Sequence, residues 1–274
     1  MTAVPLLSLT GVRKRFGALT VTDDVTLAVE PGETLGILGP NGAGKTTLFN
    51  LVSGDLRPDA GRIAFDGRDI GRLPPHARCR LGIGRSYQVP QPFGHMSVFE
   101  NLVAAACFGA GEAEEAAWET AHEVLAQTGL LRHANTPAGG LTLLDRKRLE
   151  LARALATRPR LLLLDEIAGG LTEHEARALV EELARIKAAG VTMIWIEHVV
   201  HALLAIADRL FVLDAGRRLA EGAPQAVMAS AEVRRVYMGI DGADEEATGL
   251  GPVPVSDGDA NPGTGRGPVP SAAR

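Results

Sequence analysis

Residues 39–46 read Gly39-Pro40-Asn41-Gly42-Ala43-Gly44-Lys45-Thr46 and match the phosphate-loop pattern G-x-x-x-x-G-K-[ST]. The apolar run Thr34–Leu38 before it reads as a buried strand, and the segment from Lys45 to about Ser53 reads as a helix. A strand, a glycine-rich loop and a helix in this order gather backbone N–H groups and a helix N-terminus around one phosphate group. The stretch therefore predicts an α/β fold built around a nucleoside triphosphate site.

The residue types in this loop suit separate tasks in phosphate binding. Its glycines admit the backbone angles that turn successive N–H groups into one concavity. We expect Lys45 to reach the β- and γ-phosphate oxygens and Thr46 to place its hydroxyl on Mg²⁺. The residues expected to contact ATP are Gly39, Pro40, Asn41, Gly42, Ala43, Gly44, Lys45, Thr46 and Thr47.

Two adjacent carboxylates follow another buried strand. The run Leu161–Leu164 leads directly into Asp165-Glu166, and a continuous leucine run is typical of a central strand buried on both faces. A carboxylate beside the phosphate loop can hold Mg²⁺ directly or through water, and its neighbour can act as general base on the attacking water. We therefore expect Asp165 at the metal and Glu166 as the base.

Farther out, short apolar runs alternate with helical patterns from Leu7 to about Ile240, which is typical of an α/β sheet protein. Ser-x-x-Glu at Ser97 and Thr-x-x-Glu at Thr172 are capping boxes that predict helix starts. Further strands are expected at Leu7–Val12, Val21–Val29, Arg62–Phe65, Val191–Ile196 and Arg209–Val212, and further helices at Ser97–Cys107, Glu112–Gln127, Asp145–Thr157 and Thr172–Ala189.

Composition narrows the class of protein. The chain has 274 residues, 46% of them apolar and 22% charged, which permits a large core in one or two domains. A net charge of −5 disfavours nucleic acid as the main partner. The two cysteines, Cys79 and Cys107, exclude a disulfide scaffold and fit a reducing compartment. Without a membrane-spanning apolar run or a secretory signal, we expect a cytoplasmic protein unless a partner holds it at a membrane.

The last residues, 241–274, break with the alternating pattern. They contain seven glycines and five prolines, no aromatic residue and no apolar periodicity. Such a segment cannot bury enough apolar surface to offset its ordering entropy, so we expect a disordered tail.

The order of these features resembles the ATPase subunits of ABC transporters over about residues 5–240. That order is the phosphate loop, Gln88, a helical insertion, the leucine run into Asp165-Glu166, and Glu197-His198 after a strand. In detail the chain is most similar to branched-chain amino acid importer ATPases, through Arg85-Ser86-Tyr87-Gln88 and the ending Glu232–Gly239. The resemblance implies one ATP-binding domain over 1–240: a P-loop NTPase core with a mixed sheet, an N-terminal antiparallel β subdomain and a helical subdomain over about 95–158.

The resemblance also implies roles for residues that the phosphate loop does not explain. Phe16 matches an aromatic residue that stacks on adenine, and Gln88 matches a glutamine that touches Mg²⁺ and senses the transmembrane partner. His198 matches a histidine that hydrogen-bonds the γ-phosphate, a role that suits an imidazole donor. His201 lies nearby, but no third ligand cluster accompanies it, so we do not expect a histidine metal site.

One segment departs from the family pattern. Where the family has Leu-Ser-Gly-Gly-Gln, this chain reads Leu141-Thr142-Leu143-Leu144-Asp145. Thr142 can replace the serine hydroxyl that contacts nucleotide, but Leu143 and Leu144 place side chains where the family brings glycine N–H groups to a γ-phosphate. Gly139 and Gly140 lie just upstream, so a loop shifted in register, in which these two glycines take the family's glycine positions, remains an alternative. The residues that this chain would supply to the ATP on its own phosphate loop match the family pattern. The segment that it would supply to the ATP bound by a partner subunit is altered.

What the resemblance implies for activity is ATP hydrolysis that drives a separate membrane permease, with ATP and Mg²⁺ as cofactors. Family members work as head-to-tail pairs, so we expect a second, distinct ATPase chain, with a homodimer still open. Integral-membrane permease subunits and, indirectly, a substrate-binding protein are the other expected partners. The chain would then sit peripherally on the inner face of the cell membrane.

Three alternatives remain at this point. A lipopolysaccharide-export type of ATPase is similar at Leu73–Arg78 and at the Val-Tyr-Met-Gly ending. A soluble ATPase for DNA repair, chromosome structure or translation would carry a long coiled-coil insertion or a second phosphate loop, which this chain lacks. A regulator that binds ATP without hydrolysing it fits the altered segment, although Glu166 argues against it. The transported substrate cannot be deduced from these residues.

Overall fold

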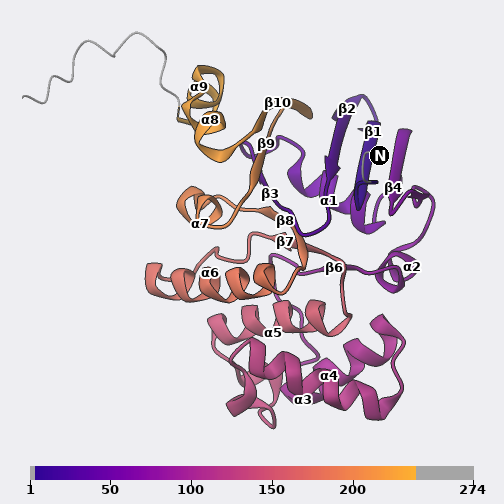
Figure 1. Ribbon diagram of the computed structural model, residues 1–274, viewed down its shortest axis with the longest axis vertical. Coiled ribbons are helices and arrows are strands. Elements are labelled where there is room, and N and C mark those ends of the chain that lie inside the picture. The colour runs from indigo at the N-terminus through magenta and orange to yellow at the C-terminus, as the bar shows by residue number, and fades with distance from the viewer. Residues whose placement is uncertain (1–3, 239–274) are drawn as a thin grey trace, which may run out of the picture. The chain divides into compact units, whose positions relative to one another are not determined.

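The strand that precedes the phosphate loop, β3 (Thr34–Leu38), lies between β9 and β8 in the larger of two sheets (Figure 1). The structure, a computed structural model, describes residues 4–238. Within that part of the chain the larger sheet has six strands in the order β10-β9-β3-β8-β7-β6, and β10 pairs antiparallel with β9 while the other pairs are parallel. Its other strands are β6 (Ile83–Arg85), β7 (Leu161–Asp165), β8 (Thr192–Ile196), β9 (Arg209–Asp214) and β10 (Arg217–Gly222).

The second sheet is antiparallel and has four strands in the described residues, in the order β2-β1-β4-β5. These strands are β1 (Leu7–Phe16), β2 (Leu19–Val29), β4 (Ala60–Phe65) and β5 (Arg68–Asp69). Gly216, in the turn between β9 and β10, accepts a hydrogen bond from Asp23 N at 2.8 Å and donates one to Ala43 O at 3.0 Å. The turn therefore joins the antiparallel sheet to the phosphate loop.

The helices begin close to the positions that their capping residues predict. The capping boxes at Ser97 and Thr172 are both present, and they start α3 and α6. Helix α5 begins at Leu143, earlier than the predicted Asp145, because the Thr142 side chain caps it. The helices are α1 (Lys45–Ser53), α2 (Pro75–Arg80), α3 (Val98–Ala105), α4 (Glu114–Gln127), α5 (Leu143–Ala156), α6 (Glu173–Ala188), α7 (Val200–Leu204), α8 (Pro224–Ala229) and α9 (Ala231–Met238), with a π-helical turn at Ala106–Ala110 and 3₁₀ turns at Leu131–His133 and Ala138–Gly140.

The leucine run of β7 divides its side chains between two cores. Leu162 and Leu164 pack with Trp195 and with helices that cover one face of the six-stranded sheet, while Leu161 and Leu163 pack in the cluster that contains α1 and the antiparallel sheet. Because neighbouring side chains of a strand point to opposite faces, a strand that separates two cores must be apolar at every position. The expected central strand is confirmed, and so is the α/β fold class with its mixed sheet and antiparallel β part.

The two tryptophans of the chain have opposite environments. Trp195 on β8 is fully buried. Trp118 on α4 is 54% exposed and lies edge-on to Phe99, with 6.1 Å between ring centroids. The first reports on the central sheet, and the second on the group of helices α3–α5 (Figure 1).

A buried cation holds the end of the phosphate-loop helix. Arg78 of α2 donates to the carbonyls of Leu51 at 2.6 Å and Val52 at 2.9 Å, in the last turn of α1. Those carbonyls have no partner within the helix, so a side chain must satisfy them where water cannot. Burial lowers the pKa of Arg78 to about 10.

Among residues 4–238 no helix combines the length and the apolar character needed to cross a lipid bilayer. The expected tail over 241–274 lies outside the described residues.

Candidate nucleotide site

The phosphate loop needs glycine at two points because neighbouring backbone leaves no room for a side chain. Gly44 has φ +100°, and a Cβ there would lie 2.5 Å from Val21 O. A Cβ on Gly39 would lie 2.2 Å from Leu213 O. Gly44 is also the N-cap of α1 and supplies no side-chain cap. The first N–H groups of α1 therefore lack a side-chain partner, which is the arrangement that favours an anion.

Lys45 lies over this loop and is nearly buried. Its Nζ donates to Gly39 O at 2.7 Å and to Pro40 O at 3.0 Å. Burial lowers the pKa of Lys45, and the nearby carboxylates of Glu166 and Asp165 oppose that shift. Phosphate oxygens are stronger partners than loop carbonyls for an ammonium group, so nucleotide is expected to replace these contacts.

A cavity of about 200 Å³ follows the loop. Predicted contact residues 41–47 line it together with Glu166 and Val21, whereas the predicted residues Gly39 and Pro40 are not in its lining. Val21 was not among the predicted site residues, and no sequence motif marks it. The full lining is Val21, Asn41, Gly42, Ala43, Gly44, Lys45, Thr46, Thr47 and Glu166.

Glu166 contacts two other residues that were predicted from distant parts of the sequence. Gln88 Nε2 donates to its Oε2 at 2.5 Å, and His198 Nε2 lies 2.7 Å from its Oε1. The Glu166 backbone has φ +47°, a left-handed conformation that is uncommon outside glycine, and its N–H donates to Ile196 O. The strands β6, β7 and β8 are neighbours, so the segments that follow them meet at one edge of the sheet.

Asp165 is buried and forms an ion pair that the sequence did not indicate. Its Oδ2 accepts from Arg85 Nη2 at 3.0 Å, and Arg85 Nη1 also reaches Asn50 Oδ1 at 2.6 Å. Burial raises the pKa of Asp165, and Arg85 opposes that rise. Arg85 stands three residues before Gln88, but only the fold shows that it faces the carboxylate.

Phe16 and Thr142 stand outside the cavity. Phe16 ends β1 and is 48% exposed, with Lys14 Nζ at 5.5 Å from its ring centroid. Thr142 caps α5, and its hydroxyl donates to Asp145 Oδ2 at 2.9 Å and accepts from Asp145 N at 3.2 Å. Neither residue lines the phosphate cavity of this chain, so stacking by Phe16 and a nucleotide contact by Thr142 stay predictions.

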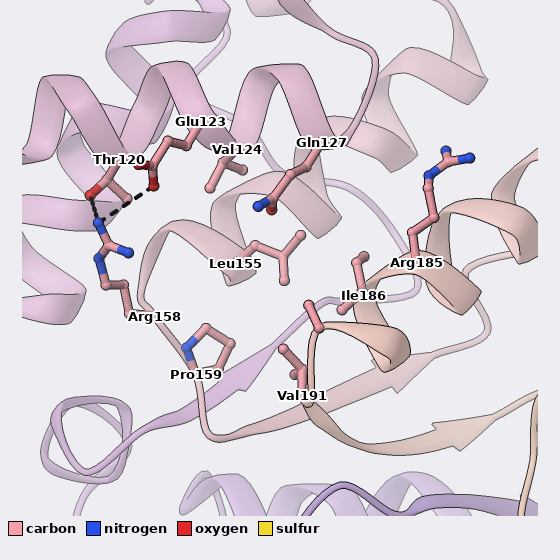
Figure 2. Close-up of a pocket in the computed structure, with 11 residues that line it drawn as sticks. Thr120, Glu123, Val124, Gln127, Leu155, Arg158, Pro159, Arg185, Ile186 and Val191 are labelled. Atoms are coloured by element: carbon pink, nitrogen blue, oxygen red, sulfur yellow. Dashed lines mark hydrogen bonds and ion pairs between the residues drawn. The ribbon is translucent and has the colours of Figure 1, made fainter.

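Another cavity, of about 320 Å³, lies between α4, the end of α5 and α6 (Figure 2). Val124, Leu155 and Ile186 give it an apolar wall, and Arg158 at its edge donates to Thr120 at 2.7 Å. Its lining includes none of the predicted site residues. The chemistry expected from the sequence therefore belongs to the smaller cavity at the phosphate loop.

The loop, the cavity and the paired carboxylates at the strand ends define a phosphate-loop nucleotide-binding protein. Comparison with known proteins supports this class. The family model described as ABC transporter matches residues 22–169. The branched-chain amino acid transport ATP-binding protein LivG of Escherichia coli K12 is 36% identical over 250 residues, which cover 86% of this chain and 98% of LivG.

Two further comparisons agree. The lipopolysaccharide export ATP-binding protein LptB of Escherichia coli K12 is 34% identical, over 86% of this chain and 98% of LptB. A crystal structure of a nucleotide-free ATP-binding cassette from an ABC transporter covers 85% of this chain and 99% of its own length, with a TM-score of 0.78 and 30% identity. The chain belongs to the ABC transporter family: it is an ATP-binding subunit and an ATPase.

Proposed function

We propose that this ATPase is the energy-coupling subunit of an importer for branched-chain or related amino acids. The similarity to LivG supports the class of substrate. The observation that carries the coupling role is the position of Glu166, which lines the phosphate cavity while Gln88 and His198 contact its two carboxylate oxygens. Binding of nucleotide in the cavity would therefore be felt, through Glu166, by Gln88 and by the segment that follows it in the chain.

In the proposed reaction, Glu166 takes a proton from water as the water oxygen attacks the γ-phosphorus. The bond between the γ-phosphorus and the bridging oxygen breaks, and ADP leaves with that oxygen. In this proposal Lys45 and the N–H groups of the loop bind the phosphates, and His198 donates to the γ-phosphate once nucleotide is bound. Gln88 and His198 fix the carboxylate before water arrives, which lowers the entropy cost of the attack.

The donor set fits Mg²⁺, which prefers oxygen ligands and retains several waters. Thr46 offers a hydroxyl in the lining of the cavity, and Asp165 offers a buried carboxylate whose Oδ2 pairs with Arg85. We propose that Thr46 and Asp165 hold the ion and that the amide oxygen of Gln88 approaches it. When bound, Mg²⁺ supplies positive charge to the β- and γ-phosphate oxygens.

We propose that the permease docks beside the segment that follows Gln88. Tyr87 and Val89 are exposed there, and a nearby groove of about 580 Å³ is lined by Phe93, Met96 and Phe108 among others. Phe108 is 79% exposed. Exposed aromatic side chains gathered in a groove are typical of a surface that a partner covers. Docking there gives the chain a cytoplasmic location, peripheral to the membrane.

We further propose that the working pair contains a second, distinct ATPase. Leu143 and Leu144 stand where the family uses glycines, and Asp145 adds a carboxylate that Thr142 and Arg148 contact. A homodimer would place this altered segment in both nucleotide sites, whereas a heterodimer leaves one complete site. Phe16 remains the proposed adenine contact, and Thr142 remains a proposed contact to the nucleotide of the partner.

The same proposal divides the chain into one ATP-binding domain over residues 1–240, with a helical subdomain over about 95–158. Residues 241–274 are proposed to add no part of the nucleotide site.

A second candidate function is lipopolysaccharide export, because LptB covers as much of this chain as LivG does. The two candidates differ in the membrane partner and agree on the nucleotide site. Identification of the permease therefore separates them.

The test is affinity purification of the tagged full chain from mildly solubilised native membranes, followed by mass spectrometry. We expect a polytopic permease pair and a second ATPase, with an amino-acid-binding protein present when substrate is added. Recovery of lipopolysaccharide-export components would select the second candidate. Recovery of soluble partners alone would overturn the coupling role and leave only the ATPase.

The substrate class needs its own measurement. Cells lacking this chain should lose uptake of labelled leucine, isoleucine and valine, and wild-type chain should restore it while the Glu166→Gln variant does not. Unchanged uptake of all three amino acids would contradict the importer assignment without affecting the nucleotide site.

A further inference from the structure

Two side chains of α5 face the chain's own catalytic segment. Leu143 and Lys147 are four residues apart and so lie on one face of the helix. Lys147 Nζ lies 3.4 Å from Glu166 O, and Leu143 Cδ2 lies 3.6 Å from the position that a Cβ on Gly170 would take. One face of the altered segment and its helix therefore supports residues 166–170 of the same chain.

Lys147 is an unusual lysine because it is almost fully buried, with 5% of its surface exposed. Burial lowers its pKa, and the carboxylates of Glu197 and Glu166 oppose that shift. A buried ammonium group persists when opposite charge and hydrogen-bond acceptors surround it. Its acceptor here is the carbonyl of Glu166, the residue proposed as the general base.

Glu197 is the second buried charge of this cluster and is 1% exposed. Its Oε1 accepts from Ala168 N at 2.7 Å, and its Oε2 accepts from His198 N at 3.0 Å. One carboxylate thus ties the loop after Glu166 to the backbone of the histidine that contacts Glu166. Burial raises the pKa of Glu197, and these backbone donors oppose the rise.

The backbone conformation of Glu166 indicates what Lys147 and Glu197 do in this cluster. A non-glycine residue at φ +47° is strained and keeps that conformation only where its surroundings hold it. The Glu166 carbonyl receives Lys147, and its N–H is bonded to Ile196 O. Both ends of the strained residue are therefore held by groups that lie outside the loop itself.

We propose that Lys147 is a positioning residue, which together with Glu197 fixes residues 166–170 and thereby orients the carboxylate of Glu166 and the ring of His198. Leu143, which is half exposed and lies beside Gly170, adds to this support. The altered segment, which offers side chains in place of glycines toward a partner's nucleotide, acts on the hydrolytic site of its own chain. This inference rests on the proposed role of Glu166.

The first test removes the charge of Lys147 and keeps the length of the side chain. Lys147→Met in the full chain should speed hydrogen–deuterium exchange over residues 166–172 without nucleotide. In the assembled transporter, kcat should fall on the order of 10-fold, because small displacements of a catalytic group cost that much or more. The KM for ATP should change by less than about twofold, because Lys147 does not line the phosphate cavity. Lys147→Arg should recover part of kcat.

Lys187→Met is the matched control. Lys187 also donates to a backbone carbonyl, that of Ile206 at 2.8 Å, and to a carboxylate, Asp208 at 2.6 Å. Its removal should change exchange near its own partners and leave residues 166–172 and kcat unchanged. If Lys147→Met and Lys187→Met lower kcat equally, the positioning role is wrong.

The second test asks whether Lys147 and Glu197 act as a pair. Lys147 and Glu197 interact electrostatically, so the loss of urea midpoint in the double variant with Glu197→Gln should be smaller than the sum of the losses in Lys147→Met and Glu197→Gln alone. This comparison stays informative if the single variant folds poorly. Strictly additive losses would overturn the pairing.

The two proposals fail in different ways. Unchanged turnover in Glu166→Gln would remove Glu166 as the base and leave the exchange result for Lys147 intact. Unchanged exchange over residues 166–172 in Lys147→Met would overturn the positioning role and leave Glu166 as the base.

Discussion

Two loops of this chain lead into helix N-termini, and their chemistry is opposite. The phosphate loop ends in Gly44, which caps α1 without a side chain. The altered segment ends in Thr142, whose hydroxyl bonds Asp145 N at the start of α5, while the Asp145 carboxylate is held by Thr142 and lies 3.6 Å from Arg148. The first loop leaves the N–H groups at the start of α1 for a ligand. The second loop satisfies one N–H group at the start of α5, that of Asp145, and adds the negative charge of the Asp145 carboxylate.

This difference shows that a helix N-terminus is an anion site only while its donors are free. Of these two loops, the phosphate loop is receptive to an anion, and the loop before α5 is made less receptive by its own side chains. Four variants test that contrast, beginning with the one expected to have the largest effect.

Glu166→Gln should abolish most ATP hydrolysis at the nucleotide site formed by this chain's phosphate loop. The loss of a general base lowers kcat by about 10²- to 10⁴-fold, while ATP affinity should remain, since the phosphate contacts are intact. Steady-state hydrolysis and ATP binding by the same preparation check this. Glu173→Gln is the control, because Glu173 is exposed and pairs with Arg177 on the surface of α6. Equal turnover in both variants would show that another group takes the proton.

Lys45→Ala should weaken ATP binding on the order of 100-fold, because hydrogen bonds to a charged group contribute about 1.5–3 kcal/mol each. Isothermal titration with ATP measures the loss, and Lys187→Ala should bind as the wild type does. Affinity unchanged in Lys45→Ala would contradict the assignment of the loop. A similar loss on changing Leu144 to glycine would erase the contrast between the two loops.

Restoring glycines at 143 and 144 should open the loop before α5 toward the partner's nucleotide. The variant is made in a Glu166→Gln background, so that the remaining turnover of the pair comes from the partner's site. That turnover should rise by at least about 10-fold, because a single well-placed donor at a developing negative charge is worth about 10²–10³ in kcat. Leu131→Gly, at another half-exposed leucine, controls for added flexibility. A fall in turnover would mean that the leucines serve the partner's site.

Thr142→Ala should lower the free energy of unfolding by about 1 kcal/mol through loss of the α5 cap. Thr172→Ala removes the equivalent cap of α6 and should lower it by a similar amount. Urea denaturation of both variants gives the comparison. If Thr142→Ala is as stable as the wild type but lowers the turnover of the ATPase pair, the Thr142 hydroxyl serves mainly as a contact to the partner's nucleotide and not as a helix cap.

The sequence predicted the fold class and the order of the main elements because those depend on local patterns. A glycine-rich loop between strand and helix and a leucine run into two carboxylates are visible in short windows. The strands β5 and β6 were not predicted, since two and three residues are too short to show a period. Strand β10 begins with two arginines and was also missed.

Besides Val21, which lines the phosphate cavity, the residues that sequence reasoning missed at the site are buried charges. Lys147 stands between Arg146 and Arg148, where a run of cations reads as a solvated helix face. Arg85 was noticed only as part of a resemblance. Their partners, Glu166 and Asp165, lie at the end of β7, whereas Lys147 is on α5 and Arg85 on β6, so only the tertiary fold shows that these cations turn inward.

The opposite environments of Trp118 and Trp195 give this chain an intrinsic optical readout. Trp195 is sealed within the central sheet, so its emission should be blue-shifted and insensitive to aqueous quenchers. The emission of exposed Trp118 should be red-shifted and readily quenched. Collisional quenching by iodide therefore separates the response of the helical part from that of the nucleotide-binding core, in unlabelled protein and during a single turnover.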